Sequence, residues 1–266
     1  MVFLSTGRCS LYGLWGNATR GGKTLQLRAL DWDLNAGLQD FPVMTVYHPL
    51  SAKLGNTFVN VAWAGFIGTL TGMSAQRIGV SEIGVSLPDK TFGDEDFAGL
   101  PFIFVQRNIL QYSATLDDAL AYIQKVRKTC RLIVGIADGK IGTARMIQYS
   151  SNRVSIYDDE NLQPLTEWHP RLPNAVYAGM DWQCPAYQYK LYKQIQQNHG
   201  EITPELSIEK ITSVAQTGDL HVAVYDLTDN HLYVANARGS NEQGPTEAYQ
   251  RQFVKVDLNV EFAREQ

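Results

Sequence analysis

The chain of 266 residues carries a formal net charge of -4, with 44 % hydrophobic and 19 % charged residues. This is the composition of a globular protein with an ordinary apolar core, which excludes a disordered or fibrous chain. The mild acidity, with no run of more than two Lys or Arg residues, argues against a nucleic-acid partner, and no stretch approaches the roughly 18 apolar residues of a transmembrane helix.

The first third of the chain predicts β-structure. Residues 9–16 and 24–30 alternate apolar and polar side chains around a turn-rich segment at 17–22, which is typical of a hairpin. The sequence GGKT at 21–24 lacks the glycine spacing of a phosphate-binding loop and fits the hairpin turn better. Three further strands are predicted at 42–48, 57–64 and 78–87.

Helices and then further strands are predicted after residue 100. Apolar residues at three- and four-residue spacing predict helices at 102–112 and 116–126, the second with Thr115 and Asp118 as an N-cap signature. Later helices are predicted at 187–198 and 204–214, and strands at 132–138, 143–150, 154–157, 221–226 and 232–237. With no visible repeat or linker, this order suggests an α+β layered domain with mostly antiparallel sheets.

Cys9 stands close to the amino terminus, and Arg28 and Asp31 follow at the end of a predicted strand. An N-terminal-nucleophile hydrolase needs this arrangement, because the chain is cut just before the nucleophile and the new α-amino group becomes its general base. An α-amino pKa of about 7.7–8 suits that base to neutral pH without a catalytic histidine. Residues 1–8 would then be a leader that must be removed, and a nearby guanidinium would lower the thiol pKa.

Three segments carry a resemblance to a known family: Cys9-Ser10, WGNAT at 15–19 and RALDWD at 28–33. Together they resemble the opening of the C45-type N-terminal-nucleophile hydrolases, a group that includes acyl-CoA:6-aminopenicillanic acid acyltransferase and the acid ceramidases. Further segments fit the acid-ceramidase-like proteins of amoebae and other protists, so that the resemblance extends from Cys9 to about residue 239; they lie at 70–73, 177–182, 216–221 and 225–227.

The resemblance implies a fold and three site residues. The fold is α+β, a four-layer αββα sandwich with mostly antiparallel sheets, built by a single domain over residues 9–266 after the leader at 1–8. Cys9 would be the nucleophile, Arg28 would hold the thiolate and orient the substrate amide, and Asp31 would position the new α-amino group.

An acyl transfer also needs hydrogen-bond donors at the developing oxyanion. The candidates are the glycine-rich loop that enters Met73 and the segment around Met180 and Asp181. Family members often have an Asn in the second segment, where this chain reads AGMD at 178–181, so that donor is missing. Arg238 is the nearest candidate for a second Arg that the family carries late in its fold.

Other interpretations of these residues fit less well. A Cys–His protease would pair Cys9 with His221 or His231, but no papain- or caspase-type signature surrounds Cys9. Zinc is disfavoured because the Cys and His residues lack close ligand spacing. Arg28 and Asp31 could instead form a structural ion pair, since such pairs are common without a function.

Asn17 opens the one glycosylation sequon of the chain, and three cysteines are too few for a disulfide scaffold. Cys130 and Cys184 either pair or remain ordinary buried thiols. The sequon and the family resemblance together predict the secretory route, with a lysosomal or extracellular destination.

The sequence therefore predicts a cysteine amidohydrolase or acyltransferase that works through a Cys9 thioester. Its partner would be a small acylated amine, by resemblance a ceramide-like lipid amide, and neither a cofactor nor a metal is expected. Two alternatives stay open: a non-catalytic relative that keeps the fold as a lipid-binding module, and a phospholipase B-like ester hydrolase with a cysteine nucleophile. The oligomeric state is left open.

Overall fold

The computed structural model describes residues 9–84, 95–179 and 186–264. The predicted leader at 1–8 and the last part of the strand predicted at 78–87 lie outside these ranges. A single domain over residues 9–266 stays a prediction. Among the described helices, none is both long and apolar enough to cross a membrane.

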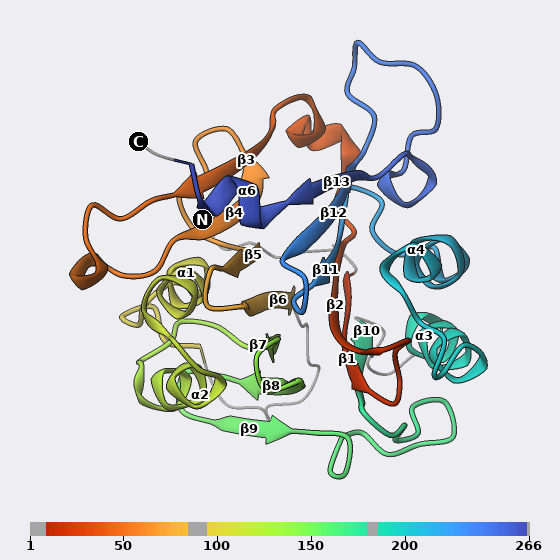
Figure 1. The fold of residues 1–266 in the computed structure, drawn as a ribbon, viewed down its shortest axis with the longest axis horizontal. Coiled ribbons are helices and arrows are strands. Elements are labelled where there is room, and N and C mark those ends of the chain that lie inside the picture. The colour runs from red at the N-terminus through yellow and green to blue at the C-terminus, as the bar shows by residue number, and fades with distance from the viewer. Residues whose placement is uncertain (1–8, 85–94, 180–185, 265–266) are drawn as a thin grey trace.

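Two antiparallel sheets form the centre of the molecule (Figure 1). The first sheet has six strands in the spatial order β10-β1-β2-β11-β12-β13. Their bounds are Cys9–Gly16 (β1), Gly22–Leu30 (β2), Ala175–Gly179 (β10), His221–Asp226 (β11), His231–Asn236 (β12) and Val254–Asp257 (β13). The predicted hairpin at 9–30 thus lies inside this sheet, with β10 and β11 on its two sides.

The second sheet has seven strands that follow one another in chain order from β3 to β9. Their bounds are Pro42–Tyr47 (β3), Phe58–Trp63 (β4), Thr71–Ser74 (β5), Ile78–Gly84 (β6), Leu132–Asp138 (β7), Thr143–Tyr149 (β8) and Val154–Tyr157 (β9). Strands in the middle of the sheets, such as β4 and β7, are buried at every residue, whereas the edge strand β3 exposes Pro42, Val43 and Met44. Central strands covered on both faces therefore show a continuous apolar pattern.

Helices cover the outer face of each sheet (Figure 1). The helices α1 (Phe102–Tyr112) and α2 (Leu116–Lys125) pack on the second sheet, and α2 begins with the predicted capping box of Thr115 and Asp118. On the first sheet lie α3 (Ala186–Gln197), α4 (Pro204–Leu206), a π-helical turn (Ser207–Thr212) and α5 (Ser213–Ala215). The short helix α6 (Leu258–Phe262) packs against β12.

These layers confirm the predicted four-layer αββα sandwich. The sequence analysis did not predict three of the strands: β5, β10 and β13. It also placed Met73 at the end of a loop, whereas Met73 lies within β5, where it is opposite Val59 of β4 and Gly79 of β6.

The two sheets approach one another closely at Gly13 of β1. A Cβ atom at this position would collide with the Cβ of Ala144 in β8, and it would also crowd Val176 of β10. The glycine therefore permits a sheet separation that a larger residue would prevent.

We expect Gly13→Ala to lower the free energy of unfolding by about 1–3 kcal/mol, because it overpacks the space between the sheets. The double variant Gly13→Ala/Ala144→Gly should recover part of this loss, since it removes the methyl group that is struck. Urea unfolding of the three proteins measures both values. Strictly additive losses would contradict this account of the contact.

Candidate active site

Cys9 is the first residue of β1, and its side chain points into the space between the two sheets. Successive strand residues face opposite sides, so Cys9 and Leu11 share one face. Arg28 of β2 lies directly opposite Leu11 and has the same orientation. Cys9 is only 4 % exposed and is a free thiol.

Arg28 forms a buried ion pair with Glu82 across the two sheets. The guanidinium Nη2 donates to Oε1 of Glu82 in β6, and Nη1 donates to the backbone oxygen of Ala29 at 2.7 Å. Arg28 is fully buried and Glu82 is 4 % exposed. Burial opposes the charge on Arg28, but the neighbouring charge of Glu82 and the contact with Cys9 raise the pKa of Arg28 well above its usual value.

The sequence analysis missed Glu82, and it left open an ion pair between Arg28 and Asp31. Within the described residues, Arg28 pairs with Glu82 instead. One signal was present: Glu82 is a lone charge inside a strand that is otherwise apolar or small. A charge in such a position is rarely buried without a partner.

The Cys9 thiol is protonated in this environment. Burial raises its pKa to about 11, which outweighs the lowering effect of the Arg28 charge; Glu82 and Asp31 raise the pKa further. Because Glu82 already balances Arg28, the guanidinium does not generate a thiolate by itself. Activation therefore needs a base.

Asp31 follows β2 and holds the loop before β11. Its Oδ1 accepts hydrogen bonds from the backbone N–H groups of Gly218 at 2.7 Å and Asp219 at 2.9 Å. The Thr217 hydroxyl lies 3.0 Å from Asp31 Oδ2 and 2.8 Å from Ser10 Oγ, which ties the loop to the beginning of β1. Burial raises the pKa of Asp31 to about 6, although the hydrogen bonds from the loop oppose this shift.

Gly218 explains why the loop can follow this path. Residues with a side chain rarely adopt its backbone φ of 90°, and a Cβ atom at this position would collide with Val222. The segment QTGDLH at 216–221, which carried part of the family resemblance, is therefore the segment that binds Asp31.

The structure separates the two histidines from the nucleophile. His221 begins β11 and lies opposite Leu30, which lies opposite Cys9. One strand thus stands between His221 and Cys9, so they do not form a Cys–His dyad. His231 begins β12, where its ring is near Asp257.

The structure describes two of the remaining predicted catalytic or substrate residues, Met73 and Arg238. Met73 is buried in β5, and its backbone is part of the sheet instead of a free loop. Arg238 follows β12 and donates to the backbone oxygen of Gly244 at 2.8 Å. Met180 and Asp181 lie outside the described residues. Asn17 is exposed on the turn between β1 and β2.

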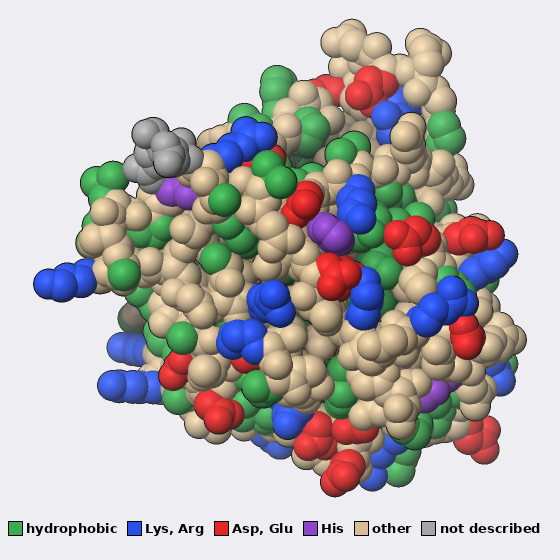
Figure 2. All heavy atoms as spheres, in the orientation of Figure 1, with side chains coloured by type: hydrophobic (Ala, Val, Ile, Leu, Met, Phe, Trp, Pro, Cys, Tyr) green, Lys and Arg blue, Asp and Glu red, His purple; other side chains and the backbone are tan. Residues whose placement is uncertain are grey.

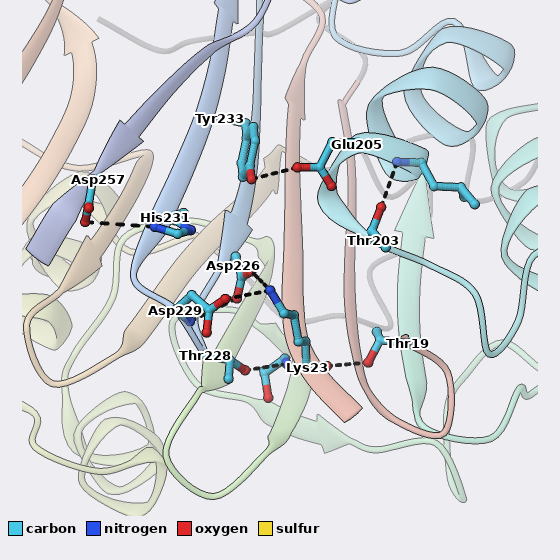
Figure 3. Close-up of polar contacts among 12 residues, drawn as sticks. Thr19, Lys23, Thr203, Glu205, Asp226, Thr228, Asp229, His231, Tyr233 and Asp257 are labelled. Atoms are coloured by element: carbon cyan, nitrogen blue, oxygen red, sulfur yellow. Dashed lines mark hydrogen bonds and ion pairs between the residues drawn. The ribbon is translucent and has the colours of Figure 1, made fainter. Parts of the chain in front are cut away.

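Asp226, Asp229 and His231 gather closely enough to hold a metal ion (Figure 3). However, the Lys23 ammonium lies 2.7 Å from Asp226 and 2.6 Å from Asp229, so a side-chain cation already occupies the space between the carboxylates. Lys23 belongs to the GGKT segment at 21–24, in which only Gly21 lies in the hairpin turn and β2 begins at Gly22.

A surface hollow of about 350 Å³ lies at the far end of β4 from Trp63. Its lining includes Tyr47, Phe58 and Arg107, and the Arg107 guanidinium lies 4.3 Å from the centre of the Tyr47 ring. Phe58 and Trp63 are the two ends of β4, about 17 Å apart at about 3.3 Å per residue. Trp63 contacts His221, which shares a cross-strand row with Cys9, so the hollow at the Phe58 end is separate from the Cys9 site.

The charged side chains on the face drawn in Figure 2 are of both signs. Figure 2 shows Lys and Arg side chains interspersed with Asp and Glu over this face of the molecule.

We expect Glu82→Gln to lower the free energy of unfolding by about 3–5 kcal/mol, because it leaves the buried Arg28 charge without a counter-charge. The matched control is Glu201→Gln, which breaks an exposed ion pair with Arg20 and should cost less than about 1 kcal/mol. Denaturant unfolding measures both variants. Equal losses of unfolding free energy in the two variants would show that the Arg28–Glu82 pair stabilises the fold no more than a surface ion pair does.

The raised pKa of Asp31 gives a definite pH dependence. The carboxyl has a pKa of 3.8 in the unfolded chain and about 6 in the folded protein, so between these values the folded state binds more protons. The contribution of Asp31 to stability is therefore fully present below pH 3.8 and is lost as the pH rises to about 6.

Relative to Asp31→Asn, the wild-type free energy of unfolding should fall over this window by at most about 1.4 kcal/mol per pH unit. Urea unfolding of both proteins in steps from about pH 4 to 7 checks the slope. A difference that rises with pH would contradict the assigned shift.

Comparison with known proteins gives two relatives in sequence. Protein dcd1B of Dictyostelium discoideum is 34 % identical over 270 residues, which cover 97 % of this chain and 52 % of that protein. Protein dcd1A of the same organism is 32 % identical and covers 96 % of this chain and 60 % of that protein. The chain thus spans between half and three-fifths of the length of these relatives. No protein-family model matches the chain.

Solved structures with low sequence identity share the architecture. They include the Caenorhabditis elegans ortholog of N-acylethanolamine-hydrolyzing acid amidase, with a TM-score of 0.59, 13 % identity and coverage of 83 % of this chain and 93 % of that one. Penicillin V acylase from Agrobacterium tumefaciens has a TM-score of 0.58 with 12 % identity, covering 86 % and 83 % of the two chains. A variant of the conjugated bile acid hydrolase from Clostridium perfringens has a TM-score of 0.61 with 10 % identity, covering 97 % and 95 %.

These neighbours confirm, at the level of the fold, the resemblance that Cys9, Arg28 and Asp31 indicate in the sequence. The chain has the fold of the N-terminal-nucleophile hydrolases.

Proposed function

We propose that this chain is a cysteine N-terminal-nucleophile amidohydrolase or acyltransferase that cleaves the amide bond of an N-acylated amine. The observation that carries the proposal is the position of Cys9, whose thiol begins a strand and faces the buried Arg28–Glu82 pair. A buried ion pair is weak evidence for stability, so its presence beside a thiol favours a role in chemistry. The names of the structural neighbours, an amidase, an acylase and a hydrolase, support the same class.

The proposed reaction begins with maturation. Cutting the bond before Cys9 removes residues 1–8 and creates an α-amino group with a pKa of about 7.7–8. This amine accepts the thiol proton, which the raised pKa of Cys9 otherwise holds in place. Asp31, which lies at the end of β2 and binds the 217–219 loop, is suited to hold the new amino terminus.

The acyl transfer then proceeds through a thioester. The Cys9 sulfur attacks the amide carbonyl, and the tetrahedral oxyanion collapses as the C–N bond breaks and the leaving amine takes the proton. Water, or an acceptor amine in the acyltransferase reaction, attacks the thioester and releases the acyl group. Arg28 lowers the pKa of the thiol against the larger effect of burial, and the segment around Met180 and Asp181 remains the proposed source of oxyanion donors.

The substrate proposed from the family resemblance is a ceramide-like lipid amide with an apolar acyl chain. We also propose the secretory route with a lysosomal or extracellular destination. The exposed position of Asn17 on the β1–β2 turn supports glycosylation of the sequon, because glycosylated sequons lie at the surface.

A second candidate is a non-catalytic lipid-binding module with the same fold. One observation favours it: the Cys9 thiol is buried and its pKa is raised to about 11, so the thiol is unreactive unless the chain is cut. The two candidates differ in maturation, because a binding module can keep Met1 indefinitely.

We expect the wild-type chain to lose residues 1–8 on incubation at acidic pH, and to hydrolyse N-acylated amines afterwards. Cys9→Ala should keep Met1 and show no turnover, since both steps use the thiol. Intact-mass measurement with N-terminal sequencing and an amine-release assay follow the two steps. Cys130→Ala is the matched control and should behave as wild type.

Turnover by Cys9→Ala would remove Cys9 as the nucleophile. A wild-type chain that still begins at Met1, binds lipid amides and releases no amine would favour the lipid-binding module.

A further inference from the structure

Among the described residues, the buried nitrogen atoms without a hydrogen-bond partner include Nε1 of Trp63 and Nε2 of His221, which both lie between the sheets. Trp63 ends β4 of the second sheet, and His221 begins β11 of the first sheet. Their rings meet edge to face, with centroids 6.5 Å apart and an interplanar angle of 72°. Because buried polar groups are nearly always paired, two unpaired groups side by side indicate the position of a ligand.

The pair lies at the same end of the sandwich as the nucleophile. Cys9, Leu30 and His221 form one cross-strand row on neighbouring strands, so His221 begins two strand spacings, roughly 10 Å, from Cys9. All three side chains face the second sheet, and Trp63 belongs to the same apolar cluster as Cys9. The pair is buried to a similar degree as the thiol, with Cys9 4 %, Trp63 9 % and His221 2 % exposed.

The two nitrogens differ in their hydrogen-bonding role. The indole N–H of Trp63 can only donate. Nδ1 of His221 lies 3.1 Å from the amide oxygen of Asn236, which can only accept, so Nδ1 carries the proton and Nε2 presents a lone pair. Burial and the charge of Arg28 lower the pKa of His221 to about 4, which keeps the imidazole neutral.

We propose that Trp63 and His221 form a polar subsite that binds a hydroxyl group of the substrate. The indole N–H donates to the hydroxyl oxygen, and the hydroxyl proton is donated to Nε2 of His221. This inference rests on the proposed amide-cleaving function, because it places the hydroxyl in the same molecule as the amide that reaches Cys9.

The subsite offers one hydrogen-bond donor and one acceptor, and this arrangement disfavours charged substrate groups. A carboxylate has no proton to donate to the lone pair of His221, and an ammonium group would be repelled by the nearby charge of Arg28. Trp63 and His221 therefore favour a neutral amide that carries a hydroxyl over a matched amide that ends in a methyl or a carboxylate.

The test compares three probes that differ only at the end of the amine: N-dodecanoyl ethanolamine, N-dodecanoyl propylamine and N-dodecanoyl glycine. The full chain should prefer the ethanolamine amide in kcat/KM by roughly tenfold, the net contribution of two neutral hydrogen bonds at about threefold each. Trp63→Phe keeps an aromatic ring and removes the donor, and His221→Phe removes the acceptor. In both variants the preference over the propylamine amide should fall towards one.

Trp168→Phe is the matched control, because Trp168 contacts His169 outside this pair, and it should keep the preference. Thermal unfolding shows whether each variant is folded; if His221→Phe fails to fold, Trp63→Phe alone decides. A wild-type preference near one, or a preference that survives in the folded variants, would overturn the subsite.

Calorimetric binding of the same probes separates this proposal from the proposed function. Turnover of all three probes at equal rates would remove the subsite and keep the hydrolase. Selective binding of the ethanolamine amide without turnover would keep the subsite and remove the hydrolase. Absence of both binding and turnover would remove both.

Discussion

The buried ion pair between Arg28 and Glu82 is the constraint on which the site depends. Neither charge can leave the interior without the other, because an unpaired charge between the sheets would cost several kcal/mol. The pair therefore fixes β2 against β6, and through β2 it fixes the neighbouring strands β1 and β11. Cys9 and His221 belong to those two strands. Their positions between the sheets thus follow from one electrostatic requirement.

The same ion pair explains why the Cys9 thiol is unreactive in the uncut chain. An unbalanced guanidinium would stabilise a thiolate, but Glu82 balances Arg28, and burial keeps the proton on Cys9. Under the proposed mechanism, the missing base is created by the cut that exposes the α-amino group of Cys9 itself. Reactivity would then be coupled to maturation by the arrangement of charges, without any large movement of the sheets.

Polar groups from distant parts of the chain meet at the end of the sandwich where Cys9 lies. Asp31 holds the 217–219 loop on the side that faces the helices, whereas Arg28, His221 and Trp63 lie between the sheets. Asp31 and its loop hold the beginning of β1 in place through Ser10. The residues between the sheets lie on the side that the Cys9 thiol faces. The side chains of residues 28 and 31 point to opposite faces of the sheet, because successive residues of a strand alternate between its faces.

Local patterns in the sequence determined the hairpin at 9–30, the capping box of α2 and most of the strands. They also identified Cys9, Arg28 and Asp31 together as candidate site residues. These features depend on residues a few positions apart, so periodicity and motif spacing reveal them. Tertiary structure alone decided the ion pair with Glu82, the contact of Trp63 with His221, and strands such as β5, which has four residues and is held by its neighbours on both sides. Each of these joins residues more than fifty positions apart or depends on a neighbouring strand. A single sequence can show that Glu82 needs a partner, but it does not say which distant residue supplies one, because the free energy of such contacts arises only when the two sheets close on one another.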